Sequence, residues 1–398
     1  MATKDNTIVL GVTGSIAAYK AAELASRFTG EGFRVDVIMT ESAQQFIAPL
    51  TFRNITGRPV VTTMWDIDSE FSVEHVALAE AADVVLIAPA TANILAKMAC
   101  GMADDMLSCT VLATKAPVVI APAMNDNMWS NPVTIENVAK LTKRGFTFVG
   151  PARGRLASGK MGLGRLTGLD DIYGITLQAL GRKGDLAGKH IVVTAGGTQE
   201  PVDPVRCLTN HSSGKMGYAV AEAARNRGAE VTLISAPTAL AIPPGIKIIG
   251  VKTAEDMLKA VQEAVKKADA LVMAAAVADF RPVKKEDKKI KRADLSYLTL
   301  ELEKTPDILA QVKGSFIRVG FAAESHDVVA NAKEKVKRKG LDLIVANDIT
   351  EMDCGFGTDT NRVTIIDSKG KVENLPLLPK GEAADRILDR LLNLLKSR

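Results

Sequence analysis

Two stretches of the sequence combine glycines and hydroxyl side chains where an apolar run gives way to a helical pattern. The first is GVTGSI at residues 11–16, which contains Gly14, Ser15 and Ile16. The second occupies residues 189–217 and ends in SSGKMG, directly before a helical pattern. Backbone N–H groups at a helix N-terminus, with glycines and hydroxyls nearby, bind phosphate and other anions. The sequence therefore predicts two anion sites, one in each half of the chain.

The first turn lacks the GxGxxG spacing of dinucleotide-binding folds, so we expect it to bind a mononucleotide phosphate. Thr40 and Ser42 follow the next apolar run and would supply hydroxyls to the same phosphate. Two structural alternatives stay open. The glycines would also suit a tight turn beneath a packed helix, and Thr40 or Ser42 would also cap the helix that follows.

The second turn offers more charge than the first. Gly196 and Gly197 open it, and Asn210 precedes the run of Ser212, Ser213, Gly214 and Lys215. Hydroxyls, backbone donors and one ammonium group suit a triphosphate. The Walker A spacing GxxxxGK[ST] is absent, so this turn would hold a nucleotide in a different way.

Polar residues also follow two buried runs of the first half. PATAN at residues 89–93 contains Ala90, Thr91 and Asn93, and PAMN at residues 122–125 contains Met124 and Asn125. Both turns should lie at the ligand-binding edge of a parallel sheet. Asn125 suits a carboxylate or an amide, or else caps the next helix. His75 begins a helical pattern and is the best general acid or base of this half, unless it is an ordinary surface residue.

The second half adds acidic and cationic candidates. Asp279 ends the run MAAAVAD and would bind a sugar hydroxyl or a base edge. Lys335 and Lys339 lie four residues apart on one helix face, where like charges repel unless an anion lies between them. Lys289 belongs to the basic stretch KKEDKKIKR, which is either a functional loop or a solvated one.

The spacing of the apolar runs predicts the elements that position these residues. Runs that are apolar throughout indicate strands buried on both faces of a parallel sheet. We therefore predict an α/β fold with two doubly wound Rossmann-like domains, at 1–182 and 189–398, joined by a polar linker at 183–188. The glycine-rich, basic stretch 151–168 has neither helical nor strand period, and we predict a mobile loop there.

Composition narrows the choice of partners. The chain has 398 residues, 47% of them hydrophobic and 24% charged, which is enough for two cores. Aromatic residues, at 4%, are too few for a base-stacking surface, and a net charge of +4 favours neither nucleic acid nor membrane. No signal peptide or spanning segment is predicted. Four cysteines without metal-binding or paired spacing (Cys100, Cys109, Cys207, Cys354) indicate reduced thiols and a cytoplasmic location.

Taken in order, these motifs resemble the bifunctional phosphopantothenoylcysteine decarboxylase/phosphopantothenate-cysteine ligase family of coenzyme A biosynthesis. The resemblance covers nearly the whole chain. It rests on GVTGSIAAYK, His75, APATANILAKMACGMADD, APAMNDNMW and the glycine-rich flap in the first half, and on TAGGTQEPVDPVR, LTNHSSGKMG, AAAVADF, KIKR, GFAAE and LIVAND in the second. It implies a flavoprotein decarboxylase domain followed by a ligase domain.

For the second half, the resemblance implies ligation of cysteine to 4'-phosphopantothenate with CTP and Mg²⁺ through an acyl-cytidylate. Asn210 matches the residue that stabilises formation of the acyl-cytidylate, and Lys289 matches the lysine of a loop that closes over it. The predicted nucleotide-binding residues are Gly196, Gly197, Ser212, Gly214, Lys215, Asp279, Phe321, Lys335 and Lys339. The predicted substrate-binding residues are Arg206, Ala275 and Ala276.

For the first half, the resemblance implies decarboxylation of phosphopantothenoylcysteine to 4'-phosphopantetheine with FMN. His75 matches the catalytic histidine, and Asn125 matches the asparagine that binds the substrate carboxylate. The predicted FMN-binding residues are Gly14, Ser15, Ile16, Thr40, Ser42, Ala90, Thr91, Asn93 and Met124. The family further implies trimers of the first domain, dimers of the second, a dodecamer of both, and a flavin site shared between subunits.

One residue departs from the family pattern. The flap of the family usually has ACG, whose cysteine protonates the enethiol, whereas this chain has Ala157, Ser158 and Gly159. A serine hydroxyl is a far weaker acid than a thiol, whose pKa is about 8.5. Ser158 would then help to close the flap while the proton comes more slowly, from water, Lys160 or another group. Two alternatives stay open: a flavin-binding regulatory half with impaired decarboxylation, and decarboxylation of peptide C-terminal cysteines.

Overall fold

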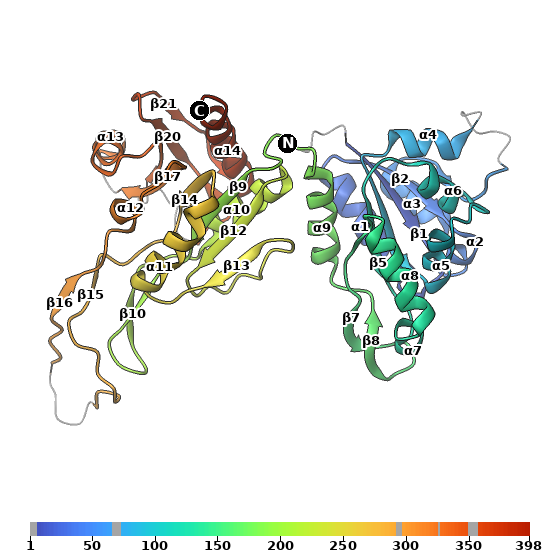
Figure 1. Cartoon of the computed structure of the whole chain (residues 1–398), viewed down its shortest axis with the longest axis horizontal. Coiled ribbons are helices and arrows are strands. Elements are labelled where there is room, and N and C mark those ends of the chain that lie inside the picture. Colours follow the sequence, from blue (N-terminus) through green and yellow to red (C-terminus); the bar gives the residue numbers. More distant parts are fainter. Residues whose placement is uncertain (1–5, 66–72, 292–296, 325–326, 349–356) are drawn as a thin grey trace. The chain divides into compact units, whose positions relative to one another are not determined.

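The computed structural model describes residues 6–65, 73–291, 297–324, 327–348 and 357–398. Its contacts divide the chain into two compact units, Met1–Arg182 (unit 1) and Lys183–Arg398 (unit 2). Each unit is built on its own central sheet with helices on both faces (Figure 1). None of the helices among the described residues is long and apolar enough to cross a membrane. The predicted α/β architecture of two Rossmann-like domains is confirmed.

Unit 1 contains a six-stranded sheet in the order β3-β2-β1-β4-β5-β6. All of its strand pairs are parallel, so their carboxyl ends meet at one edge. The strands are β1 (Thr7–Val12), β2 (Arg34–Met39), β3 (Val60–Val61), β4 (Val84–Ala90), β5 (Val118–Pro122) and β6 (Thr147–Phe148).

Helices cover both faces of this sheet because side chains along each strand alternate between the two faces. Leu10 of β1 packs beneath α1 (Tyr19–Gly30), α3 (Pro49–Thr56) and α9 (Leu169–Gly181). Its neighbour Val9 belongs to the core on the opposite face. That face is covered by α4 (Glu74–Ala81), α5 (Ala92–Cys100), α6 (Met106–Ala113) and α8 (Pro132–Lys143).

The stretch predicted as a mobile loop instead forms an antiparallel hairpin of β7 (Ala152–Arg155) and β8 (Met161–Arg165). The prediction of a loop was wrong because the buried positions of these strands are Gly154, Gly162 and Gly164. Glycine has no side chain, so the alternation between the two faces is invisible in the hydrophobic pattern.

Unit 2 contains an eight-stranded sheet in the order β13-β12-β9-β14-β17-β18-β20-β21. The strands are parallel from β13 to β18, and the last two are antiparallel. Their bounds are β9 (His190–Ala195), β12 (Glu230–Ser235), β13 (Lys247–Gly250), β14 (Ala270–Met273), β17 (Ile317–Glu324), β18 (Leu343–Asp348), β20 (Val363–Asp367) and β21 (Val372–Asn374).

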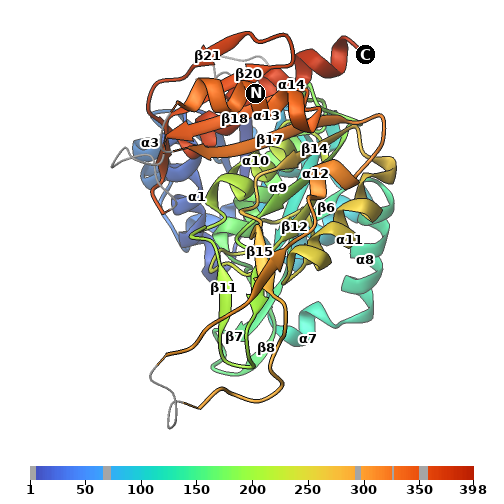
Figure 2. The same ribbon diagram turned by 90° about the vertical axis from the view of Figure 1, so that its left-hand side faces the viewer.

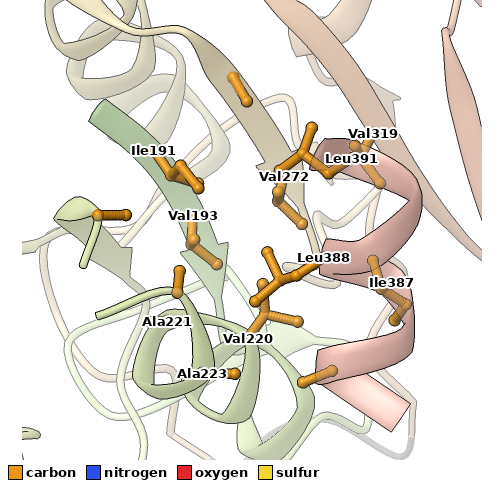
Figure 3. Packing of buried hydrophobic residues seen from close by; sticks show 14 of the residues in the cluster. Ile191, Val193, Val220, Ala221, Ala223, Val272, Val319, Ile387, Leu388 and Leu391 are labelled. Atoms are coloured by element: carbon orange, nitrogen blue, oxygen red, sulfur yellow. The ribbon is translucent and has the colours of Figure 1, made fainter. Parts of the chain in front are cut away.

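The core of unit 2 is formed by β9 against α10 (Lys215–Asn226) and α14 (Lys380–Lys396). In Figure 3, Ile191 and Val193 of β9 lie close to Val220 of α10 and to Leu388 of α14. The opposite face of the sheet is covered by α11 (Ala254–Ala264), α12 (Ile308–Gln311) and α13 (Val328–Lys339). The polar ends of the strands are therefore the remaining places for ligand-binding side chains.

Two small hairpins extend from the sheet of unit 2. One pairs β10 (Gln199–Pro201) with β11 (Cys207–Thr209), and the other pairs β15 (Phe280–Pro282) with β16 (Leu302–Lys304). The second hairpin runs away from the sheet as an extended arm in both views (Figures 1 and 2). Because β10 and β15 are in contact, the turn after Pro201 lies near the basic stretch that contains Lys289.

A buried cation ties residues of the predicted linker to unit 2. The guanidinium of Arg227, 2% exposed, donates to the carboxylate of Asp185 at 2.6 and 2.9 Å and pairs with Asp389 at 2.9 Å. Leu186 is completely buried in the core that β9, α10 and α14 form. Two residues of the segment predicted as a linker therefore pack within unit 2. They are Leu186, which is buried, and Asp185, which pairs with Arg227.

We expect Arg227→Ala to lower the free energy of unfolding of unit 2 by about 3 kcal/mol, because it leaves partly buried carboxylates without their cation. Burial raises the pKa of Asp185, but the hydrogen bond and the charge of Arg227 outweigh it, and the net pKa is lowered. The stabilisation is therefore present at neutral pH and is lost as the pH falls below about 3.9. Urea unfolding at pH 7 and at about pH 3 measures both effects.

The matched control is Arg338→Ala, which removes an exposed arginine that lies 3.8 Å from Glu334. An exposed pair of this kind contributes at most about 1 kcal/mol. Equal losses in the two variants would contradict a structural role for the buried cation.

Candidate active sites

Unit 2 has a cavity of about 820 Å³ at the carboxyl ends of β14, β17 and β18. Its walls come from the turn at residues 210–217, the segments 273–277 and 304–309, and one face of α13. The structure brings ten of the predicted residues into this lining, which are Asn210, Ser212, Gly214, Lys215, Ala275, Ala276, Asp279, Phe321, Lys335 and Lys339.

The turn at residues 210–217 depends on glycine at the start of α10. Gly214 precedes this helix with φ of 77°, and a Cβ atom there would lie 2.7 Å from Cγ2 of Thr238. Only glycine adopts this conformation without strain and without that clash. The N-terminus of a twelve-residue helix consequently opens directly into the cavity.

Gly196 and Gly197 lie beneath the cavity and are not among its lining residues. A Cβ atom on Gly197 would lie 2.8 Å from the carbonyl oxygen of Asn210, and one on Gly196 would lie 2.9 Å from that of Ala236. The Ala276 N–H also donates to the Gly196 carbonyl at 2.8 Å. The two glycines let the chain pack against itself under Asn210, and their predicted contact with a nucleotide stays a prediction.

Cations of the cavity are paired with groups of the protein. Nζ of Lys215 donates to the Gly357 carbonyl and to Oδ1 of Asp359, both at 2.7 Å. This hydrogen bond, together with the positive charge, lowers the pKa of Asp359. Nζ of Lys339 lies 3.4 Å from Oδ2 of Asp307. These lysines are positioned before any ligand arrives.

Sequence reasoning missed Lys380, the first residue of α14, which is 8% exposed and lines the same cavity. Its ammonium group donates to the carbonyl of Thr358. It also missed Asn361, whose buried Oδ1 has no hydrogen-bond partner among the residues that the structure describes. A single lysine or asparagine outside a glycine-rich turn has no sequence signal, and only the fold brings these residues to the cavity.

Two predicted residues of unit 2, Arg206 and Lys289, do not line the cavity. The guanidinium of Arg206 donates to the Asp203 carboxylate at 3.0 Å and to the carbonyl of Ile290 at 3.4 Å. Ile290 follows Lys289 directly, so the two predicted residues belong to one arrangement that lies outside the cavity lining.

Unit 1 has a cavity of about 650 Å³ at the carboxyl edge of its sheet. Seven predicted residues line it, namely Gly14, Ser15, Ile16, Thr91, Met124, Asn125 and Ser158. Three cations that were not predicted also line it, Lys20 of α1 and the hairpin residues Arg155 and Arg165. The hairpin that carries the two arginines shows no alternation of apolar and polar residues, because its buried positions are glycines. The two arginines were therefore not predicted as lining residues.

The hydroxyl and amide side chains of this cavity also cap helices. Ser15 caps the short 3₁₀ helix η1 (Ile16–Ala18), Thr91 caps α5, and Oδ1 of Asn125 accepts from the Asn127 N–H at 2.9 Å at the start of α7 (Asp126–Trp129). Thr13 links the first two turns, because its hydroxyl donates to the Pro89 carbonyl at 2.7 Å and accepts from the Thr91 N–H at 3.1 Å. The capping alternative is therefore confirmed for Asn125, which lines the cavity at the same time.

Five predicted residues of unit 1 lie outside this lining. Thr40 caps α2 (Glu41–Gln44), as the alternative prediction had it, and Ser42 lies where a Cβ atom of Gly14 would clash, at 2.4 Å from it. Ala90 is completely buried, and Asn93 lies on α5. His75 lies on α4, which packs against α6. Their predicted roles stay predictions.

The hairpin β7–β8 forms one wall of the cavity through backbone contacts. The Met124 N–H donates to the Gly164 carbonyl at 2.9 Å, and a Cβ atom on Gly164 would approach the Met124 carbonyl oxygen to 2.2 Å. The tip of the hairpin is closed by the Leu156 N–H, which donates to the Lys160 carbonyl at 2.8 Å, and it carries Ser158. The hairpin therefore presents Ser158 to the cavity that Asn125 lines.

Comparison with known proteins identifies the family of this chain. Residues 1–181 match the Flavoprotein family, and residues 186–395 match the DNA/pantothenate metabolism flavoprotein C-terminal domain. The coenzyme A biosynthesis bifunctional protein CoaBC of Vibrio vulnificus is 43% identical over 98% of both chains. The chain belongs to this bifunctional family.

A further relative agrees with the assignment. The CoaBC protein of Bacillus subtilis is 44% identical over 398 aligned residues, again 98% of both chains. A crystal structure of the C-terminal domain of a CoaBC protein is 41% identical, and it covers 54% of this chain and all of that domain with a TM-score of 0.47. The family resemblance predicted from the motifs is confirmed.

Proposed function

We propose that unit 2 joins cysteine to 4'-phosphopantothenate with CTP, and that unit 1 decarboxylates the product to 4'-phosphopantetheine with FMN. Membership of the bifunctional family supports both activities. The observation that carries the proposal is that each sheet of the chain has a cavity at its carboxyl edge, lined by its own set of motif residues. Two separate cavities suit two successive reactions.

In unit 2, the lysines explain how a carboxylate would be activated. A carboxylate becomes an acylating agent only when its oxygen joins a phosphate leaving group, and cations must neutralise the charge that develops on the phosphoryl oxygens. Lys215, Lys335, Lys339 and Lys380 all line the cavity. Nδ2 of Asn210 donates to the Val277 carbonyl at 3.0 Å, which orients this amide for the acyl-cytidylate step.

Mg²⁺ would enter this cavity with the nucleotide. The described residues contain no cluster of three acidic, histidine or cysteine side chains. Mg²⁺ at nucleotide sites needs only one or two carboxylates, because phosphates and water supply its remaining ligands. Asp279 and Asp307 line the cavity, and Asp307 is paired with Lys339. Asp279 is therefore the carboxylate that we assign to the metal or to the ribose.

In unit 1, the lining fits FMN. Hydroxyls of Ser15 and Thr91 at two helix N-termini suit its phosphate, and Lys20, Arg155 and Arg165 add positive charge. FMN supplies the oxidation and the later reduction of the substrate. Asn125 would bind the substrate carboxylate, and the hairpin would exclude water. Ser158 would help this closure while the final proton comes from water, Lys160 or another group.

A homo-oligomer would complete the site in unit 1. His75 is the proposed acid or base, but it is not among the residues that line the cavity with Asn125 and Ser158. Trp65 and Leu112 are 81% and 63% exposed on the surface of unit 1. Large exposed apolar residues of this kind suit a contact with a second copy. We propose that a neighbouring copy contributes His75, within the trimer and dodecamer that the family implies.

A cytoplasmic location would suit this chemistry. Cys100, Cys109 and Cys207 are free thiols, and Cys354 lies outside the described residues. Free thiols are typical of a reducing compartment.

The two activities are tested by incubating the full chain with CTP, cysteine, 4'-phosphopantothenate and Mg²⁺. We expect CMP, CO₂ and 4'-phosphopantetheine. Asn210→Ala should abolish release of CMP and all later products, whereas Asn125→Ala should leave CMP release unchanged and abolish formation of CO₂ and 4'-phosphopantetheine. CMP without CO₂ from the unmodified chain would support the alternative of a regulatory flavin-binding half, and no CMP would overturn the ligase.

Single-turnover flavin absorbance tests the role of Ser158. We expect Ser158→Ala to reoxidise the reduced flavin as fast as the unmodified chain, because the hydroxyl is not the acid. Ser158→Cys should be about tenfold faster or more, since its thiol is far more acidic. Slower reoxidation in Ser158→Ala, with flavin content unchanged, would contradict this expectation and give the serine a part in the final reduction, as proton donor or in closing the flap.

Sharing of the site between subunits is tested with two inactive variants, His75→Ala and Asn125→Ala. Co-expressed with different tags and purified as mixed oligomers, they should recover about a quarter of normal decarboxylation, because one interface in four pairs an intact His75 with an intact Asn125. Each variant alone is the control. Mixed oligomers without any decarboxylation would place both residues in the site of a single chain.

A further inference from the structure

The carboxylate of Asp203 joins two segments of unit 2 that lie far apart in the sequence. Its Oδ1 accepts from the Val205 and Arg206 N–H groups at 2.8 and 2.7 Å, which closes the turn after β10. Its Oδ2 accepts from Nη1 of Arg206 at 3.0 Å and from the N–H of Ile290 at 3.2 Å. One oxygen thus serves the local turn, and the other reaches the basic stretch.

Ile290 is held from both sides. Its N–H donates to Asp203, and its carbonyl accepts from the guanidinium of Arg206 at 3.4 Å. A second backbone bond lies four residues earlier, where the Glu286 N–H donates to the Val202 carbonyl at 3.0 Å. Lys289, whose side chain is exposed, therefore lies between two attachment points on the turn at residues 202–206.

The Asp203 side chain is completely buried, so its carboxylate depends on hydrogen-bond donors of the protein. A buried carboxylate is tolerated only when donors satisfy it, and the donors here come from the two joined segments. Burial raises the pKa of Asp203, but the N–H donors of Val205, Ile290 and Arg206 and the Arg206 charge outweigh it, so that the net pKa is lowered. The carboxylate stays charged at neutral pH and holds both segments.

We propose that Asp203 is a positioning residue for the ligase reaction, because it fixes Ile290 and Arg206 and thereby fixes the chain next to Lys289. This inference rests on the proposed ligase function, in which Lys289 closes over the acyl-cytidylate. It also gives Arg206 a role within its own chain, since the guanidinium is directed at the backbone next to Lys289.

Asp203→Asn separates this role from that of the local turn. The remaining amide oxygen can still accept from the Val205 and Arg206 N–H groups, whereas the new NH₂ group cannot accept from Ile290 or from the guanidinium. Ile290→Pro removes the same bond from the other side and leaves Asp203 intact. The control is Asp367→Asn, because Asp367 accepts from the N–H groups of Lys369 and Lys371 in a turn of the same kind.

The first readout is limited trypsin digestion of the full chain, followed by mass spectrometry of cleavage between the exposed residues Lys288 and Lys289, a bond that Ile290→Pro leaves cleavable. Loss of buried, charge-assisted hydrogen bonds should speed this cleavage about tenfold in Asp203→Asn and Ile290→Pro, but not in Asp367→Asn. This result does not depend on ligase activity. Unchanged cleavage in both variants would overturn the positioning role even where the ligase is confirmed.

The second readout is CMP release in the background of Lys289→Ala. Asp203→Asn alone should lower kcat about tenfold, with the KM for CTP within about twofold of normal, and it should cause no further loss once Lys289 is absent. Additive losses would show that Asp203 acts otherwise than through Lys289. If the unmodified chain released no CMP, the proposed function would fail, and the digestion result would still decide whether Asp203 holds the segment.

Discussion

Burial of the parallel strands on both faces is the constraint on which both units depend. Val9 and Leu10 are adjacent in β1, yet they belong to cores on opposite sides of the sheet, and Val192 and Val193 do the same in β9. Helices occupy both faces, so polar side chains can gather only where the strands end. That geometry accounts for a cavity at the carboxyl edge of each sheet, with glycines, hydroxyls and amides in its lining.

The same constraint explains which parts of the fold could be predicted. Uninterrupted apolar runs identified the long central strands, because both faces of these strands require hydrophobic residues. The hairpin β7–β8 escaped detection, since its buried face consists of Gly154, Gly162 and Gly164. Leu186 was missed for a related reason: one apolar residue in a polar segment forms no periodic pattern, although it is completely buried.

The predicted residues line a cavity where the motif and the sheet edge coincide, as for Asn210 to Lys215 and for Asn125. The motifs did not show which atom each glycine accommodates. Gly197 suggested an approach to a nucleotide, yet the atom that it accommodates is the carbonyl oxygen of Asn210. Nor did the motifs reveal Lys380 or Arg155, because their places in the cavity follow from tertiary packing alone. The separation of His75 from the other predicted residues likewise depends on how α4 packs.

The pairing of Lys215 with Asp359 bears on how the ligase half responds to salt. In the proposed reaction, a nucleotide phosphate that reached Lys215 would replace the Asp359 carboxylate that pairs with it, so binding would exchange one anion for another. The change in local charge is then smaller than the charge of the nucleotide alone would give. Screening acts in the same direction on both the pair that is broken and the pair that is formed. The affinity of this half for its nucleotide should consequently tolerate changes in ionic strength.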